Sequence, residues 1–240
     1  MMENGSPHRQ IEVVQFLQEV TVEGGRVDSK NNDRMEEILD CAATLFFRKG
    51  YHGTSIKDIA REVGMLKGSL YYYIDSKEDV LCDIVYGVIE QGLAGVQKAI
   101  EGVSDPAEQL RRGLDQQIEV IIRNQVRVGL YLHEFNALSK RKQQHIQEAR
   151  RKYQEVFVGI LKQGQSSGVF VQGDPELLTN AMMGMCNWIY RWYRPGISPP
   201  LETVKRTFVG LLMGGILAAS DSGGLHRALD SPSKTYAVSD

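Results

Sequence analysis

The sequence predicts an all-α fold made of a three-helix head and a larger helical domain. Apolar residues recur at the three- and four-residue spacing of a helix face in one segment after another. Residues that start helices, and glycines that end them, stand between these segments. No two segments alternate apolar and polar residues as paired strands do, so helices are expected throughout.

The composition limits what the chain can be. Its 240 residues carry a net charge of -2, so any binding to nucleic acid has to come from a local surface. The three cysteines form no CxxC pair, which argues against a metal site and a disulfide framework and favours a cytoplasmic location. The apolar run at 208–219 contains glycines and is too short to cross a bilayer, so no membrane partner is expected.

The pattern divides the chain into four regions. Residues 1–30 are polar and contain paired glycines, and residues 220–240 have the same character, so both are expected to be flexible. Residues 31–78 form the expected head, and residues 79–219 form the expected larger domain.

Capping residues and glycines delimit three helices in the head and open a long one after it. In the larger domain, two further helices begin with Asp-Pro, where the missing N–H of proline is not needed. The expected helices run from the N-cap Asp33 to Gly50, from Thr54 or Ser55 to Gly64, from Lys67 to Tyr73 and from Ser76 to Ile100, and then over 105–122, 125–138, 143–163, 175–193 and 200–219.

The short helices of the head suit binding to DNA. A bihelical unit of this size can place one helix in the major groove, which is about 12 Å wide. Outside its apolar pair, Leu70 and Ile74, the third helix carries polar and aromatic side chains. Gly68 would let the backbone approach DNA closely, and lysines stand at or near the helix starts, where they can reach phosphates.

These residues resemble the DNA-binding signature of the TetR family of transcriptional regulators. The resemblance includes the runs GYHGTSIKDIA at 50–60, GMLKGSLYYYI at 64–74 and SKE at 76–78. It departs at Tyr73, where histidine is common, and at Ile74, where phenylalanine is common. The resemblance implies a helix-turn-helix with the DNA-binding residues Thr54, Ser55, Lys57, Lys67, Gly68, Ser69, Tyr71, Tyr72, Tyr73 and Lys77.

The larger domain resembles the family in its helical architecture, which implies a small effector. Methionines at 182, 183 and 185 suit an irregular apolar ligand, although such a stripe is also typical of plain core. The segment 187–196 reads NWIYRWYRPG and resembles the same region of TetR-family regulators that sense acyl-CoA in fatty-acid or sterol catabolism. Its arginines would bind phosphates or, alternatively, stack on the aromatic rings. The candidate effector-binding residues are Met182, Met185, Trp188, Arg191, Trp192 and Arg194.

The expected protein is a homodimeric repressor that needs no cofactor and releases a palindromic operator when an effector such as an acyl-CoA binds. Small residues such as Gly210 and Gly214 make the last two long helices the expected dimer face. Three alternatives remain: a sensor of drugs or other hydrophobic compounds, a helical adaptor that does not bind DNA, and an enzyme that acts on acyl-CoA through His133 and Glu134. No further catalytic pattern accompanies that pair, so no catalytic site is expected.

Overall fold

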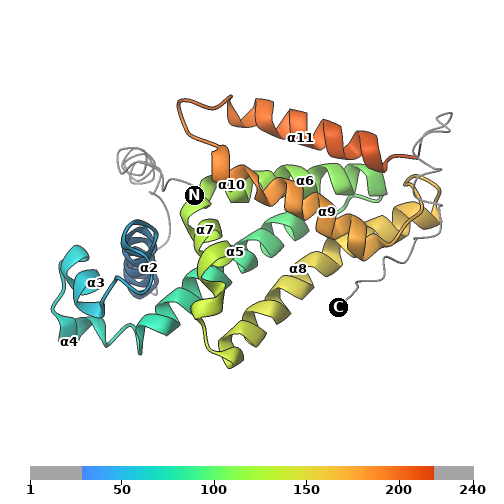
Figure 1. Ribbon diagram of the computed structural model, residues 1–240. Coiled ribbons are helices and arrows are strands. Elements are labelled where there is room, and N and C mark those ends of the chain that lie inside the picture. Colours follow the sequence, from blue (N-terminus) through green and yellow to red (C-terminus); the bar gives the residue numbers. More distant parts are fainter. Residues whose placement is uncertain (1–28, 219–240) are drawn as a thin grey trace, which may run out of the picture.

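Helices make up most of the chain that the structure describes. The computed structural model describes residues 29–218 (Figure 1), and nearly all of the two extensions expected to be flexible lies outside them. The helices are α2 (Ser29–Lys49), α3 (Ile56–Glu62), α4 (Lys67–Leu70), α5 (Lys77–Ile100), α6 (Pro106–Arg123), α7 (Gln125–Glu134), the 3-10 helix η1 (Phe135–Ala137), α8 (Lys140–Ser166), α9 (Pro175–Asn187), α10 (Ile189–Trp192) and α11 (Leu201–Ile216).

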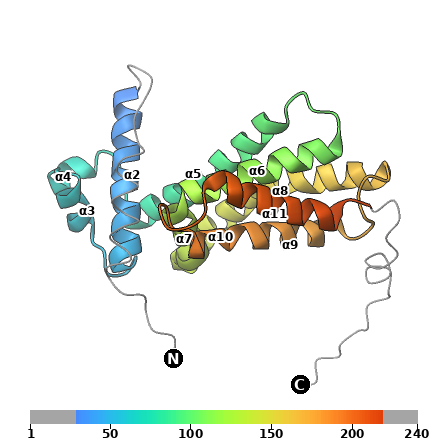
Figure 2. The same cartoon turned by 90° about the horizontal axis from the view of Figure 1, so that it is seen from above.

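Helices α2, α3 and α4 form a head at one end of the molecule (Figures 1 and 2). Their shared core contains Ile38, Phe46, Ile59 and Leu70, all of them fully buried. Helix α2 begins at Ser29, so Asp33 lies inside the helix and is not its N-cap. No glycine or proline separates the two positions, and the helix therefore extends further back than the capping pattern indicated.

Helix α5 joins the head to the larger domain. This helix packs against α2 and α7 near the head and against α6 and α8 further along (Figure 1). Helices α9 and α11 lie against α6 on one side of the domain. Asp105 and Asp174 cap α6 and α9 with a proline in the first turn, which confirms both of the helix starts expected from Asp-Pro.

In the larger domain, two expected helices are interrupted, and the last one is shorter than expected. The span 125–138 is divided between α7 and η1, and the span 175–193 is divided at Trp188 between α9 and α10. The amide of Arg191 donates to the carbonyl of Trp188 in a tight i to i+3 bond just after the break. Helix α11 ends at Ile216, because residues 217 and 218 turn to bond with residues 169–171 in a single antiparallel bridge. Within residues 29–218, no helix is long and apolar enough to span a membrane.

Candidate functional site

The turn between α3 and α4 is fixed by local hydrogen bonds. Ser55 is the N-cap of α3, and its hydroxyl and backbone exchange hydrogen bonds with Asp58 in a complete capping box. After α3, Gly64 takes a φ of +72°, a conformation that few residues other than glycine adopt. The amide of Met65 then donates to the carbonyl of Ala60 at 2.8 Å. This turn sets α4 against α3, with Leu70 buried between them and the rest of the head.

Most of the expected DNA-binding residues lie on one exposed segment around α4. Ser55 and Lys57 at the start of α3 are exposed. Tyr73 is half-buried. The exposed residues of the α4 segment are Lys67, Gly68, Ser69, Tyr71 and Tyr72. The outer surface of the head is thus built from the side chains that the sequence motif singled out.

Helix α4 is shorter than expected. It ends at Leu70, and Tyr71 to Tyr73 form a turn instead of a last helical turn. The amides of Tyr72 and Tyr73 donate to the carbonyls of Ser69 and Leu70, so the chain tightens into i to i+3 bonds. Tyr72 consequently projects away from the core and is 78% exposed.

Thr54 and Lys77 hold the head together. The hydroxyl of Thr54 is buried and donates to the carbonyl of Gly50 at 2.9 Å and to that of Leu45 at 3.3 Å. The ammonium group of Lys77 donates to the carbonyls of Tyr51 and Thr54 at 2.9 and 2.8 Å, and it lies 4.3 Å from the centre of the Tyr51 ring. In this structure both side chains are bonded to the head itself.

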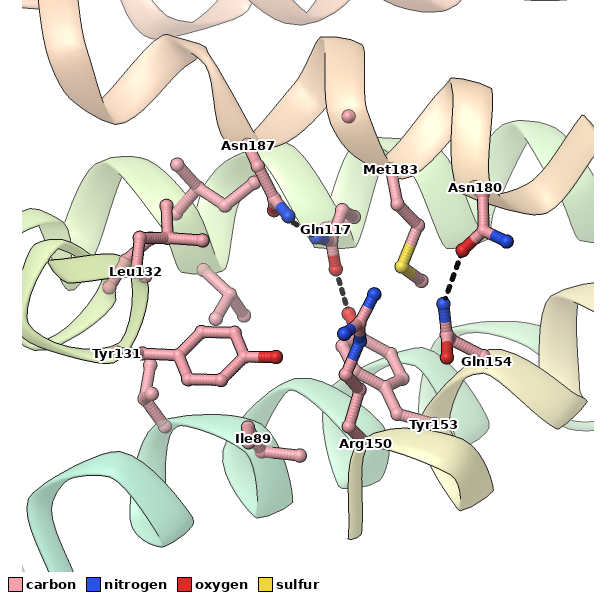
Figure 3. A pocket seen from close by; sticks show the side chains of 15 residues that line it. Ile89, Gln117, Tyr131, Leu132, Arg150, Tyr153, Gln154, Asn180, Met183 and Asn187 are labelled. Carbon is pink, nitrogen blue, oxygen red and sulfur yellow. Dashed lines mark hydrogen bonds between the residues drawn. The ribbon is translucent and has the colours of Figure 1, made fainter. Parts of the chain in front are cut away.

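A pocket of about 200 Å³ lies inside the larger domain (Figure 3). Helices α5 to α9 each contribute to its wall, and the lining is mainly apolar, with Val88, Ile89 and Ile121 among its members. The lining residues are Val88, Ile89, Gln117, Val120, Ile121, Val128, Tyr131, Leu132, Arg150, Tyr153, Gln154, Asn180, Met183, Gly184 and Asn187.

Polar groups in the pocket wall bond to one another. The hydroxyl of Tyr153 donates to the side-chain oxygen of Gln117, whose amide nitrogen donates to Asn187 at 3.3 Å (Figure 3). Burial raises the pKa of Tyr153, so its phenol stays protonated and keeps donating. Because this network is internally satisfied, it can form a fixed wall without a ligand.

Arg150 brings a positive charge to the pocket. It is exposed at the pocket edge, and no carboxylate of residues 32–218 lies within 4.0 Å of its guanidinium group. Burial raises the pKa of Tyr131, and the Arg150 guanidinium beside it partly opposes that rise. The pocket therefore combines an apolar interior with a cation that has no acidic partner in the described chain.

Comparison with known proteins identifies the chain. Residues 38–84 match the family of bacterial regulatory proteins called the tetR family, and residues 103–216 match the tetracyclin repressor-like C-terminal domain. The transcriptional repressor KstR2 of Mycolicibacterium smegmatis is 30% identical over 190 residues, which are 78% of this chain and 93% of that protein. The chain belongs to the TetR family of transcriptional regulators.

Two solved structures are similar to this chain over most of their own length. PfmR from Thermus thermophilus is 33% identical with a TM-score of 0.69, covering 74% of this chain and 97% of that one. AibR, solved in complex with isovaleryl coenzyme A and operator DNA, is 29% identical with a TM-score of 0.69, covering 75% and 98%. The chain is therefore a TetR-type repressor that binds DNA and not an enzyme or an adaptor. His133, the centre of the enzyme alternative, is hydrogen bonded to the Tyr190 hydroxyl at 2.6 Å.

The six effector-binding residues expected in this TetR-family chain do not line the pocket. Met182 is buried in the core beside it, while Met185 on α9 and Trp188, just after the end of α9, are exposed. Trp192 stacks on Phe208, and Arg194 donates to the carbonyl of Tyr193 at 2.8 Å. Arg191 is exposed. From α9 it is Asn180, Met183, Gly184 and Asn187 that face the pocket.

One sequence signal could have located the pocket of this regulator. On α6, the apolar stripe runs through Leu110, Leu114, Ile118 and Ile121, and Gln117 lies on the same buried face. A glutamine that is only 5% exposed among such residues needs partners inside the domain. An amide in an apolar stripe therefore indicates an internal polar site, which here is the Gln117 end of the pocket.

Two groups of salt bridges connect the pocket helices of this regulator to the head. On α7, Arg127 donates to Glu36 and Asp40 of α2 at 2.7 and 2.8 Å. On α8, Lys142 donates to Asp79 at the start of α5 at 2.5 Å. The bonds from Lys142 and Ser76 lower the pKa of Asp79 and keep the carboxylate ionised. The head is thus tied to α7 directly and to α8 through the first turn of α5.

Proposed function

We propose that this repressor is controlled by a small acyl thioester, a fatty acyl-CoA or a related compound, bound in the pocket of the larger domain. Arg150 is the observation that carries the proposal: a guanidinium group without an acidic partner in the described chain stands at the edge of an apolar cavity. An acyl thioester of coenzyme A has an apolar acyl chain and anionic phosphates, which this arrangement fits. The printed description of AibR, with isovaleryl coenzyme A, supports the same ligand class.

The size of the pocket favours a short acyl group. At about 200 Å³, it lies below the range of roughly 300–1,000 Å³ that is usual for drug-sized ligands. A large hydrophobic drug, the alternative effector, would need the helices to move apart and would gain nothing from Arg150. A short or branched chain needs less rearrangement and leaves the phosphates outside, near the exposed arginine.

The mechanism we propose is a shift between two arrangements of the head. Helix α5 lines the pocket with Val88 and Ile89 and begins at Lys77, which is bonded to the head. An effector that binds more tightly when α5 is displaced would favour a head position that no longer fits the operator. Release of the operator follows only from this difference in affinity between the two arrangements.

We further propose that the regulator is a homodimer through α9 and α11 and acts in the cytoplasm on a palindromic operator. Leu177 on α9 and Trp188, the C-cap residue of α9, are 67% and 61% exposed, and their spacing places them on one side of the helix. On α11, Leu211 is 64% exposed, and a Cβ added at Gly210 or Gly214 would meet no atom within 4 Å. Large apolar side chains next to exposed glycines suit close packing against a second copy. Phe208 and Leu212, also on α11, instead pack inward.

A titration of the repressor–operator complex with acyl-CoA thioesters of increasing chain length tests the effector. We expect short acyl-CoA thioesters to lower operator affinity, and Arg150→Gln to raise the concentration needed by about tenfold or more, since a charged hydrogen bond is lost. Arg151→Gln, on the solvent side of the same helix, is the control and should respond as wild type. The effector proposal fails if no acyl-CoA changes operator affinity while neutral hydrophobic compounds do.

The dimer is tested separately by light scattering after gel filtration. Leu177→Arg should convert the protein to a monomer, because it places a charge in the proposed interface. Ile197→Arg, at a residue that is 77% exposed in the loop before α11, should leave the dimer intact. A wild-type protein that is monomeric at micromolar concentration would contradict the proposal.

A further inference from the structure

Leu66 immediately precedes α4, and its apolar side chain is almost fully exposed to solvent. Among the large hydrophobic side chains of residues 32–218, the two most exposed are Leu66 at 81% and Tyr72 at 78%, and they flank α4 on either side. Helix α4 lies at the outer end of the head (Figure 1). The core of the head is completed without Leu66, since Leu70 and Ile74 provide the buried contacts of this segment.

The side chain of Leu66 also contributes nothing to the start of the helix, although its carbonyl accepts a hydrogen bond from the amide of Leu70. It occupies the N-cap position with an extended backbone, at φ -68° and ψ 144°, and its side chain makes no capping hydrogen bond. Serine, threonine, asparagine and aspartate are favoured there, because their oxygens accept a hydrogen bond from the first turn. Leucine at this position therefore neither caps α4 nor packs in the core, and its apolar surface is left for a partner.

The surroundings of Leu66 indicate which partner that is. Lys67, Gly68 and Ser69, the residues after it, are exposed on the same segment, and the chain belongs to a family of DNA-binding regulators. The first residues of a recognition helix contact base edges in the major groove. The groove displays one apolar group, the C5 methyl of thymine, and apolar side chains recognise it by contact.

We propose that Leu66 is a specificity-determining residue that recognises a thymine methyl group in each operator half-site. The proposal rests on DNA binding by the head and is independent of the effector and of the pocket. Leu66 supplies discrimination between thymine and other bases, while the lysines of the head supply affinity for phosphates. It thus adds a base-reading residue to those that the sequence motif indicated.

The test uses duplexes that the full chain selects from a random library. In a selected duplex, each thymine is replaced in turn by uracil, which removes only the methyl group, and affinity is measured by fluorescence anisotropy. For wild type we expect one position per half-site where replacing thymine by uracil weakens binding about fourfold. This is the change in affinity expected when one buried methyl group is lost. Leu66→Ala should bind the thymine and uracil duplexes equally, with the same salt dependence as wild type, because no phosphate contact is removed.

Two controls separate recognition from folding. Leu66→Ser can cap α4, so its melting temperature should equal or exceed that of wild type while its preference for thymine is lost. Ile197→Ala removes an equally exposed apolar side chain far from the head in sequence and should keep the preference. The proposal is overturned if uracil is tolerated by wild type at every position, if Leu66→Ala keeps the same penalty, or if the selected duplexes share no thymine.

Discussion

The guanidinium group of Arg127 lies 2.8 Å from the carboxylate of Asp40, so a helix that lines the pocket is bonded to the first helix of the head. The same nitrogen also contacts Glu36 at 2.7 Å. The Arg127 side chain is only 14% exposed, whereas both carboxylates are more than half exposed. The contact therefore lies at the boundary of the two domains, where a movement of α7 reaches α2 without an intermediate residue.

Replacing Arg127 should weaken this boundary. We expect Arg127→Gln to lower the free energy of unfolding by about 1 kcal/mol, the upper end for ion pairs with exposed partners. Arg123→Gln is the matched control, because Arg123 is 58% exposed and pairs with Glu119 on its own helix. We expect Arg123→Gln to lower the free energy of unfolding by less than about 0.5 kcal/mol. Urea unfolding measures both, and equal losses would show that the inter-helix bonds add nothing.

Lys77 should matter for stability even without DNA. Lys77→Met leaves the carbonyls of Tyr51 and Thr54 without their donor and should lower the free energy of unfolding by about 1–2 kcal/mol. Lys57→Met changes an exposed lysine of the same head and should leave stability unchanged. Thermal unfolding in the absence of DNA distinguishes them, and a fully stable Lys77→Met protein would argue for a purely DNA-binding role.

Asp58 should make the head sensitive to acid. Hydrogen bonds from the Ser55 hydroxyl and backbone amide lower the pKa of Asp58 to about 2, from an ordinary value near 3.9. Because the folded-state pKa is the lower one, the ionised carboxylate stabilises the fold above about pH 4, and this contribution is lost as the pH falls towards about 2. The difference in melting temperature between wild type and Asp58→Asn should therefore shrink from pH 5 to pH 2. A difference that stays constant over this interval would contradict the assignment.

Lys67 should contribute to operator binding through its charge. It is exposed beside Gly68 and lies 5.7 Å from the centre of the Tyr71 ring. If it neutralises one phosphate, Lys67→Ala should lower affinity and reduce the slope of log K against log salt by about 0.9. Lys98→Ala, which removes an exposed lysine near the far end of α5, should change neither quantity. If Lys67→Ala changes neither the affinity nor the slope, Lys67 does not contact the operator.

The head was largely predictable because its signals are local. Ser55, Gly64 and Ser76 determine helix ends through bonds to residues a few positions away, and the structure confirms each of them. The early end of α4 was not predictable, because nothing in the Tyr71 to Tyr73 run forbids a helix. Local periodicity also gave no sign that the Thr54 hydroxyl is used inside the head.

The pocket was less predictable because it depends on how five helices pack together. The methionines of α9 looked alike in sequence, yet Met183 faces the pocket, Met182 the core and Met185 the outside. The rotation of α9 about its axis decides this, and that rotation is set by its contacts with α6 and α8. Arg150 was likewise indistinguishable from its basic neighbours in the sequence, because the packing of α8 against α5, α6 and α9 decides which of them reaches the pocket.

The division between α9 and α10 gives the protein a built-in optical probe. The chain has two tryptophans, Trp188 at the break and Trp192 in α10, so all of its indole fluorescence comes from one segment of five residues. Trp192 is shielded by its stacking on Phe208, whereas Trp188 is 61% exposed and emits in contact with water. A second copy that covers α9 would shift this emission to shorter wavelength, and a dilution series would then report the dissociation constant of the unlabelled protein.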